Sequence, residues 1–521
     1  MEEFGMPQCY GCYALCIFLV FLVHAVVRAK FGASKKLGPK LPPGPWQLPL
    51  IGSSHCLLSR RLPHHRMRDL SLCHGQLMLL RICERVVVVV SSAEAAGEVF
   101  GDTAFEQRPT SPALDELYSR HGMGIVFAPY GDHWRLLRRV LVTELLSAQR
   151  VESFRRIREQ EAARLVSSLH ATAAAAASPS DQLANIDERL AVFVTDSAVH
   201  AIFGDMTMPD RAALLDTLEQ ALEFSSLFDL RDLFPSSWLV RMLPRNSKAE
   251  RNRLEVVRLM DGILRIHEER RSSGEAAAAG EQDMVDVLLR IQSEGAMGSV
   301  SLTHGIIMDM LIDVFVAAIK ATTSTLRWAM AELMANPTVM EKVQSEIRRV
   351  LAGQGRVREV AVRDMGYLKA VIKETLRLHP PIPLTPRFCT QDRKIQGYDV
   401  PKGTILVANV WAISRDPNYW QGQDPDKFMP ERFEAEQTFN FMGSDFEFIP
   451  FGAGRRICPG IAFSQANIEF ALASLLYHFD WALPKGVRPE ELDMTESCGL
   501  EVRRKAELLL RPIPRIPQVD E

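Results

Sequence analysis

The stretch FIPFGAGRRICPG, residues Phe448 to Gly460, decides the fold of this chain. Its core, Phe451 to Gly460, fits the pattern F-x-x-G-x-R-x-C-x-G at every fixed position. Gly452 and Gly454 permit a tight loop whose backbone amides point at the Cys458 sulfur. Pro459 and Gly460 lead into a predicted helix, whose positive amino-terminal end favours a thiolate at that sulfur.

A stabilised thiolate at Cys458 is a suitable axial ligand for haem iron, and its electron donation favours cleavage of the O–O bond. A buried structural cysteine and a catalytic nucleophile are the alternatives for an isolated Cys. The flanking glycines and the adjacent Arg455 and Arg456 favour the haem ligand. The sequence therefore predicts a haem site, with Phe451, Arg456, Cys458 and Gly460 as cofactor-binding residues and Cys458 as the metal ligand.

Charged residues upstream fit the same interpretation. Glu374 and Arg377 lie three apart in KETLR, so they share one helix face and can form an ion pair, and Arg432 in PERF can complete a buried triad. Arginine suits bidentate recognition of carboxylates. We therefore expect the two carboxylates of a haem to pair with Trp134, Arg138, Arg387 and Arg456.

The amino-terminal segment is a predicted membrane anchor. Cys9 to Val27 comprises 19 residues with no formal charge, close to the roughly 20 residues with which a helix spans a bilayer. A cleaved signal peptide is the alternative, but Glu2 and Glu3 precede the apolar stretch instead of basic residues. The basic residues that follow place the body in the cytosol. We expect an anchor at residues 1–28, a basic and Pro-rich hinge at 29–52 and one catalytic domain at 53–521.

Composition excludes some functions. The net charge of −3 and the lack of a basic stripe interleaved with aromatic residues argue against nucleic acid as a partner. Nine scattered cysteines argue for a reducing compartment and against a disulfide framework.

The body is predicted to be mainly α-helical with small β-sheets. Residues 75–92 have the β-branched enrichment of two strands, followed by a helix capped by Ser91 or Ser92. Thr303 to Asn336 shows apolar residues at helical spacing over about 50 Å of helix. The Ala-rich stretches 170–181 and 272–283 are expected to be surface connections.

Taken together, these motifs resemble a plant microsomal cytochrome P-450 of the A-type group (clan 71), and the resemblance covers essentially the whole chain. It implies the mainly α haem-thiolate fold, b-type haem and a single-pass location in the endoplasmic-reticulum membrane. It also implies electrons from NADPH through a separate reductase, O2, and oxygenation of a small lipophilic substrate. The implied substrate pocket draws on the loop before Trp134, the long helix, the stretch after Pro381, and the tail around Gly499 and Leu500.

The long helix departs from this family at VAAIKATTS, residues Val316 to Ser324. Members carry A-G-x-D/E-T-S/T there, and ungapped counting puts Lys320 at the acid and Ala321 at the threonine. A one-residue shift puts Thr322 at the threonine, which makes Thr322 the candidate catalytic residue. An ammonium group is costly to desolvate, so Lys320 is expected either to lower its pKa or to reach a carboxylate or water outside the pocket.

Three classes of function remain after this departure. The first is a monooxygenase acting on a plant specialised metabolite, which the resemblance favours. The second is a haem-thiolate dehydratase or isomerase, for example of an oxime, that needs no oxygen activation. The third is a haem-binding chain with low turnover.

Overall fold

The computed structural model describes residues 39–110, 124–175, 183–204, 211–226, 230–243, 247–273, 283–295, 302–420, 424–434, 439–499 and 501–516. The predicted anchor and most of the predicted hinge lie outside these ranges. Among the helices in these ranges, none is both long enough and apolar enough to cross a membrane.

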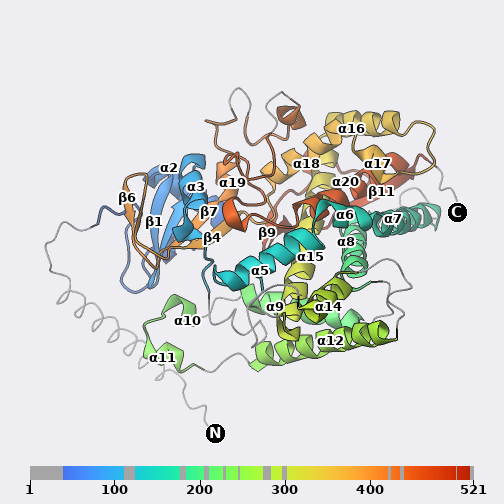
Figure 1. Cartoon of the computed structure of the whole chain (residues 1–521). Helices are drawn as coiled ribbons and strands as arrows, with labels where there is room; N and C mark the ends of the chain where they lie inside the picture. The colour runs from blue at the N-terminus through green and yellow to red at the C-terminus, as the bar shows by residue number, and fades with distance from the viewer. Residues whose placement is uncertain are drawn as a thin grey trace, which may run out of the picture.

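The helix α15, His304–Ala335, forms the axis of the molecule (Figure 1). Its 32 residues begin after Thr303, whose side chain accepts a hydrogen bond from the amide of Ile306, and they end at Asn336 before a proline. This matches the predicted helix because apolar side chains recur along it and stop signals stand at both ends. The helix packs against α8 (Ile186–Phe203), α18 (Gly366–Leu378) and α20 (Ile461–His478).

The two ends of α15 belong to two different hydrophobic cores. Its amino-terminal half, up to Phe315, packs with α12 and α14. Its carboxy-terminal half, from Leu326, packs with α16, α18 and α20. The segment between them, residues 316–325, carries the unusual VAAIKATTS sequence and contributes no fully buried apolar residue to either core. This segment is therefore available to line cavities.

The remaining helices surround this axis. In chain order they are α2 (Pro63–His74), α3 (Ala93–Gly101), α5 (Asp132–Val140), α6 (Ala148–Ser153), α7 (Arg155–Ala175), α9 (Arg211–Ser226), α10 (Leu230–Leu233), α11 (Trp238–Arg241), α12 (Ser247–Ser272), α14 (Met284–Glu294), α16 (Pro337–Val350), α17 (Glu359–Val362) and α19 (Val410–Ile413).

The β structure is small and divided. One sheet has the order β1-β2-β7-β4, with β1 (Leu77–Ile82), β2 (Arg85–Val90), β7 (Ile405–Asn409) and β4 (Leu384–Phe388), and only its β2–β7 pair is parallel. It lies at the left end of the molecule in Figure 1. A second sheet joins β3 (Ala184–Asn185), β11 (Leu509–Pro514) and β8 (Phe479–Ala482), and the pairs β5–β6 (Arg393–Ile395, Tyr398–Val400) and β9–β10 (Glu496–Cys498, Val502–Arg504) are separate.

Local sequence signals explain these elements well. The predicted hairpin at 75–92 is β1 with β2, and Ser92 caps α3 by accepting a hydrogen bond from the amide of Ala95. The Ala-rich stretch after His170 differs from the expected surface connection, because α7 continues to Ala175. Alanine has the highest intrinsic helix propensity, so the run prolongs the helix instead of ending it. The predicted fold class, mainly α with small sheets, is confirmed.

Candidate haem-thiolate site

The Cys458 loop folds as its glycines predict. The backbone amide of Cys458 donates to the carbonyl of Phe451 (3.0 Å), and the amide of Gly460 points at the Cys458 Sγ (3.4 Å). Burial raises the pKa of the Cys458 thiol, against the effects of the Gly460 amide and of nearby Arg138 and Arg108. A thiolate at this depth therefore needs a further positive partner, which a ferric ion provides.

Gly454 shows why the loop has this sequence. Its φ is +69°, and a Cβ atom on this residue would lie 2.2 Å from the backbone oxygen of Phe100. Any other residue would therefore be strained and would push the loop away from α3. The close approach fixes the short 3-10 turn Gly454–Arg456 that precedes Cys458.

Arginines from three separate elements gather near the loop: Arg138 on α5, Arg387 on β4 and Arg456 in the 3-10 turn. Arg138 donates to the carbonyl of Ile457 (2.6 Å), and Arg456 donates to those of Val126 and Ala128. Burial and repulsion from Arg108 and Arg456 lower the pKa of Arg387 to about 9.

Two of these guanidinium groups have no matching anion. Within the described ranges, Arg387 donates only to the carbonyl of Pro386 and forms no ion pair, and Arg456 bonds only backbone carbonyls while its buried Nε has no partner. Burial, followed by repulsion from Arg108, lowers the pKa of Arg456 to about 10, although Glu106 opposes this. Buried charges are normally paired, so the site fits a ligand that brings negative charge, such as the carboxylates of haem.

Trp134 and Phe451 complete the set of predicted cofactor residues. Trp134 is buried on α5, and its indole Nε1 donates to the carbonyl of Ile125 (3.2 Å) while the Arg456 guanidinium lies over its ring. Phe451 packs edge-on against Phe441 with ring centroids 5.1 Å apart. The structure thus places both aromatic residues in the walls that hold Arg456 and the loop.

The segment 316–325 of α15 presents different side chains to different neighbours. The Thr322 hydroxyl lies 3.1 Å from that of Ser464 on α20, the helix that begins just after the Cys458 loop. Lys320 precedes Thr322 by two residues, which turns its side chain by about 200° around the helix. Ala321 stands between them, and its carbonyl accepts from the Thr325 hydroxyl.

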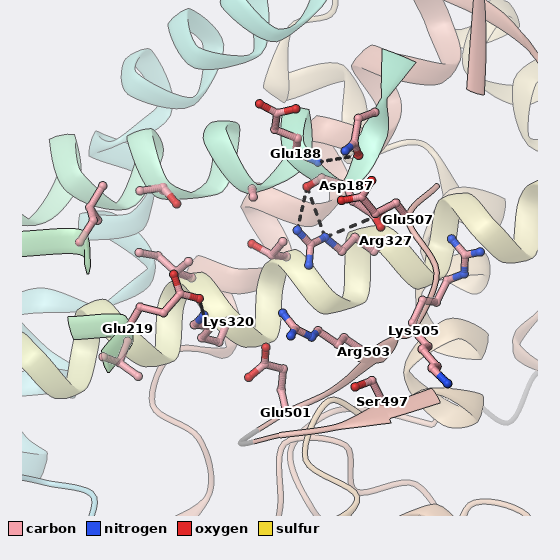
Figure 2. A pocket seen from close by; sticks show the side chains of 18 of the residues that line it. Asp187, Glu188, Glu219, Lys320, Arg327, Ser497, Glu501, Arg503, Lys505 and Glu507 are labelled. Atoms are coloured by element: carbon pink, nitrogen blue, oxygen red, sulfur yellow. Dashed lines mark hydrogen bonds and ion pairs between the residues drawn. The ribbon is translucent and has the colours of Figure 1, made fainter. Parts of the chain in front are cut away.

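Two arrangements were expected for Lys320, a lowered pKa or a contact with a carboxylate or water outside the pocket. In the structure Lys320 makes the contact with a carboxylate. Its Nζ lies 3.0 Å from the Oε1 of Glu219 on α9, and the two side chains are 27% and 62% exposed. Figure 2 shows the two groups directed at one another. Both line a pocket of about 660 Å³. Lys320 thus reaches a carboxylate on the side of α15 away from Thr322.

The pocket beside Lys320 is polar. It lies between α8, α9, α15 and the β9–β10 hairpin, and its walls include Arg327, Arg503 and Glu501. The Thr323 hydroxyl is buried on this side and has no hydrogen-bond partner among the described residues. Such a lining suits water and ions better than it suits a lipophilic molecule.

The predicted Glu–Arg–Arg triad is present and fully paired. Arg377 binds Glu374 through two hydrogen bonds of 2.7 and 2.8 Å, and Arg432 Nε lies 3.1 Å from the same carboxylate. All three residues are buried, and carbonyls of the segment 414–427 accept the remaining Arg377 protons. The triad therefore joins α18 to the segment that leads to the Cys458 loop.

Comparison with known proteins settles the family. The family model described as "Cytochrome P450" matches residues 42–509. The chain belongs to the cytochrome P450 family. A solved zebra fish cytochrome P450 with abiraterone superposes with a TM-score of 0.71 at 25% identity, covering 87% of this chain and 99% of that one. The mainly helical fold with small sheets is thus the cytochrome P450 fold.

Curated plant members are similar over nearly the full length. Desmethyl-deoxy-podophyllotoxin synthase of Sinopodophyllum hexandrum is 42% identical, covering 96% of each chain. Ent-cassadiene hydroxylase of Oryza sativa subsp. japonica is 42% identical, covering 99% of this chain and 98% of that one. Premnaspirodiene oxygenase of Hyoscyamus muticus is 39% identical, covering 97% and 99%. The protein is accordingly a haem-dependent oxidoreductase of the monooxygenase type, which uses O2, a redox partner and a lipophilic substrate.

Three residues near the site were not predicted from the sequence. Arg108 acts electrostatically on Arg387, Arg456 and Cys458, yet it stands in a connection without a motif. Glu219 and Ser464 are single polar residues on helices far away in the sequence. No local signal marks any of the three, because their roles depend on elements that only the fold brings together.

Proposed function

We propose that the chain is a membrane-bound monooxygenase that inserts one oxygen atom from O2 into a small, mostly hydrocarbon specialised metabolite of the terpenoid kind. The observation that carries the proposal is the Cys458 loop beside buried arginines for which the described residues provide no matching anion. The names of the similar plant proteins, among them ent-cassadiene hydroxylase and premnaspirodiene oxygenase, support the substrate class.

In this proposal each of the predicted residues has a separate role in binding haem. Cys458 ligates the iron, and the Gly460 amide holds the sulfur as a thiolate. Arg138, Arg387 and Arg456 neutralise the haem carboxylates, while Trp134 and Phe451 wall the site. The bound haem supplies the activation of O2 and the transfer of one oxygen atom to the substrate.

The segment of α15 around Lys320 limits how well protons are delivered at this site. The ion pair with Glu219 keeps Lys320 away from the Thr322 side, and Ala321 offers no hydroxyl group. Thr322 remains the candidate catalytic residue, with its hydroxyl oriented by Ser464. General acid catalysis contributes about 10²–10⁴-fold to the rate of a step that needs a proton. Because the usual acid and hydroxyl are missing here, we infer that part of the NADPH consumed yields hydrogen peroxide instead of product.

The proposal includes the cellular setting. Residues 1–28 anchor the protein in the endoplasmic-reticulum membrane, residues 29–52 form the hinge, and residues 53–521 form the cytosolic catalytic domain. Electrons come from NADPH through a separate cytochrome reductase, and membrane lipid surrounds the anchor. Protease treatment of sealed microsomes tests the orientation, because the body should be digested; full protection would contradict it.

A second candidate follows from the same segment of α15. A haem-thiolate dehydratase or isomerase, for example one acting on an oxime, requires no proton delivery to bound O2. The absence of an acid at position 320 and of a hydroxyl at position 321 is compatible with such chemistry. A haem-binding chain with low turnover is the remaining alternative.

The decisive assay uses microsomes that contain the protein and a reductase, supplied with a panel of cyclic sesquiterpene and diterpene hydrocarbons. We expect one or more to gain a single oxygen atom in a reaction that needs NADPH and O2. Product formed without NADPH or O2 would establish the dehydratase or isomerase class. Cys458→Ala should abolish both the product and the red-shifted Soret band of the ferrous CO complex, whereas Cys83→Ala, a buried cysteine outside the loop, should not.

The role of Lys320 and Ala321 is tested by their joint replacement. With a substrate in hand, Lys320→Asp combined with Ala321→Thr should raise the ratio of product to NADPH consumed more than either change alone, because the two groups act together. Tight coupling in the wild type, with less product from the double variant, would show that the chain uses another proton route.

A further inference from the structure

A second group of possible metal ligands lies outside the haem site. His64 and His65 at the start of α2 and Glu496 at the start of β9 place one donor atom each within 4.8 Å of one another. The Nε2 atoms of His64 and His65 lie 2.8 and 3.0 Å from the same oxygen, Glu496 Oε2. Two imidazoles and one carboxylate are a common donor set for zinc.

The spacing of these atoms is compatible with one shared ion. Zinc bonds to nitrogen and oxygen are about 2.0–2.2 Å long, so neighbouring ligands of a tetrahedral ion lie roughly 3.3–3.6 Å apart. The two observed separations are shorter than this, and small rotations of the side chains would open them. The Nε2 of His65 is buried, and its contact with Glu496 is the one ion pair that it makes in the part of the chain that the structure describes.

His379, just after α18, lies beside the same carboxylate. Its side chain is 9% exposed, its ring stacks on Trp328 at 3.8 Å, and its Nε2 lies 2.7 Å from Glu332 Oε1. Its Nδ1 has no hydrogen-bond partner among the described residues and lies 4.0 Å from Glu496 Oε1.

The Nδ1 of His379 and the Oε1 of Glu496 are thus close enough for a cation, a proton or a water to lie between them. We propose that His64, His65 and Glu496 bind a zinc ion that ties the β9–β10 hairpin to α2, with His379 beside the Glu496 carboxylate.

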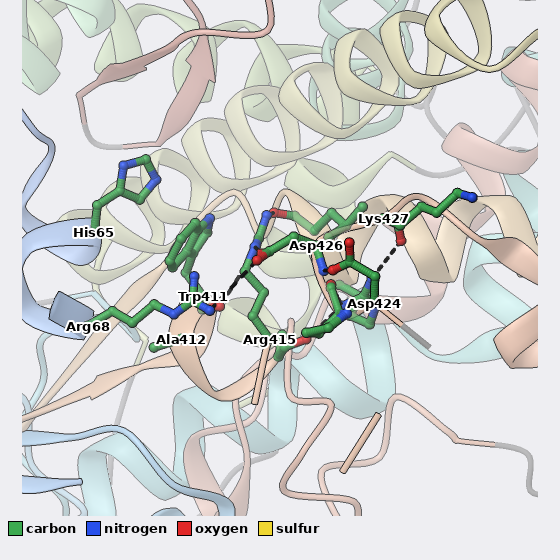
Figure 3. Close-up of polar contacts among 12 residues, drawn as sticks. His65, Arg68, Trp411, Ala412, Arg415, Asp424, Asp426 and Lys427 are labelled. Atoms are coloured by element: carbon green, nitrogen blue, oxygen red, sulfur yellow. Dashed lines mark hydrogen bonds and ion pairs between the residues drawn. The ribbon is translucent and has the colours of Figure 1, made fainter. Parts of the chain in front are cut away.

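Glu496 supplies the negative charge of the cluster, and the imidazoles of His64 and His65 both face its Oε2. Histidine binds a metal through a neutral imidazole, so on binding the Nε2 proton of His64 moves to Nδ1 or to solvent. A neighbouring cation, Arg415, is occupied by Asp426 at 3.1 Å and by the Trp411 ring, which Figure 3 shows between Arg415 and His65.

The position of the cluster gives the ion a role. Beyond Glu496 the hairpin turns at Gly499, and on its return strand the carbonyl of Val502 accepts from Ser324 and Trp328 of α15. The amide of Val502 donates to the carbonyl of Pro381 (2.9 Å). An ion at Glu496 would therefore stiffen the hairpin and the stretch after α18 together, two segments that the family resemblance assigns to the substrate pocket.

The test uses the full-length haem protein in detergent, stripped with a chelator and dialysed against buffered free Zn²⁺. We expect one tightly bound zinc per chain by elemental analysis, with a zinc X-ray absorption spectrum that shows only nitrogen and oxygen neighbours. His65→Gln should weaken zinc binding by about tenfold or more. The matched control is His304→Gln, which removes an exposed histidine paired with Glu268 at 2.9 Å and should change nothing.

His65→Gln is the main variant because Glu496 keeps its contact with His64, so the fold should tolerate the change; an unchanged CO spectrum confirms this. Failure of the wild type to bind zinc more tightly than His65→Gln would overturn the proposal. So would sulfur among the zinc neighbours, or equal binding by all variants, which would move the ion to another cluster such as His267, Asp283 and Asp286.

Discussion

Two groups of buried arginines in this protein differ in how their charge is balanced. Arg377 and Arg432 share the carboxylate of Glu374, and backbone carbonyls take their other protons. Arg387 and Arg456 are buried as deeply, yet within the described residues they bond only backbone carbonyls. The first group is complete within the chain, whereas the second fits the anionic cofactor that we propose for it.

This difference separates structural charges from functional ones. A buried ion pair that is already satisfied contributes to the fold, and removing one partner leaves an uncompensated charge. A buried charge that lacks a partner is a candidate for ligand binding. Substitution in the first group should therefore destabilise the fold, whereas substitution in the second should weaken cofactor binding. The predictions that follow test this contrast.

Glu374→Gln should have the largest effect. The change keeps the side-chain size but leaves two buried guanidinium groups without an anion, which costs about 3–5 kcal/mol. We expect little folded haem protein on expression, measured by the CO difference spectrum and by thermal unfolding. Glu434→Gln is the control: its exposed partner Lys342, at 2.8 Å, makes a pair worth about 0–1 kcal/mol. Equal unfolding temperatures for the two variants would show that the triad is not what holds this region.

Glu469 on α20 is an acidic residue that is largely buried and, like Arg387, has no ion-pair partner among the described residues. It makes no hydrogen bond or ion pair within the described ranges, and its pKa is raised to about 7, by burial first and by repulsion from Glu359, against the attraction of Lys369. The folded state therefore keeps its proton up to about pH 7, whereas the unfolded chain loses it near the ordinary value of 4.5.

The sign follows from this difference in proton binding. The stability of the wild type should fall as pH rises from about 4.5 to about 7, by as much as about 3 kcal/mol. Glu469→Gln should remove that fall, so the difference in unfolding temperature between variant and wild type should grow with pH. Glu341→Gln, an exposed acid on α16, serves as the control and should show no such trend. A pH-independent difference for Glu469→Gln would mean that its carboxylate has a partner.

Arg387→Met should affect the cofactor more than the fold. Removing a buried, unpaired charge does not strand a protein carboxylate, so the chain should keep its secondary structure. Loss of a charge-assisted hydrogen bond, worth about 1.5–3 kcal/mol, should speed the transfer of haem to excess apomyoglobin roughly 10–100-fold. Arg393→Met, which removes a partly exposed partner of Asp102, is the control and should leave haem transfer unchanged. Loss of folding as severe as that of Glu374→Gln would contradict the comparison.

Lys320→Met should have the smallest effect on stability. Its ion pair with Glu219 is partly exposed, and such pairs contribute about 0–1 kcal/mol. A double-mutant cycle with Glu219→Gln, followed by thermal unfolding, should give a coupling energy below about 1 kcal/mol. A coupling of about 2 kcal/mol or more, twice the upper end expected for such a pair, would indicate that α9 depends on this contact.

Much of the fold was predictable because its signals are local. The pattern of β-branched residues predicted β1 and β2. The helical spacing of apolar residues from Thr303 to Asn336 predicted α15. The spacing of Glu374 and Arg377 placed both on one face of α18, and the triad with Arg432 formed as predicted. The prediction of a surface connection directly after His170 was wrong, because α7 continues to Ala175. The alanine-rich composition of this stretch favours helix.

The candidate site was predictable in its residue types and less so in its contacts. The Cys458 loop is continuous in sequence, so its hydrogen bonds followed from its glycines. Arg108, Glu219 and Ser464 come from distant elements, and no periodicity marks which neighbour a single polar side chain will meet. The site roles of all the candidate residues stay predictions: Trp134, Arg138, Thr322, Arg387, Phe451, Arg456, Cys458 and Gly460. The stretch before Trp134 at residues 111–123, and Leu500 in the tail, lie outside the described residues.

The sequence by itself determined that a cysteine would stand in a glycine-rich loop before a helix, because backbone freedom and helix polarity are properties of neighbouring residues. It also determined that Lys320 would need a counter-charge or water, because an ammonium group is costly to desolvate. Only the tertiary structure decided that Glu219 supplies this charge, that Arg387 and Arg456 have no anion among the described residues, and that His379 faces Glu496. These pairings join residues separated by long stretches of chain, and electrostatic interactions depend on distance in space and not in sequence.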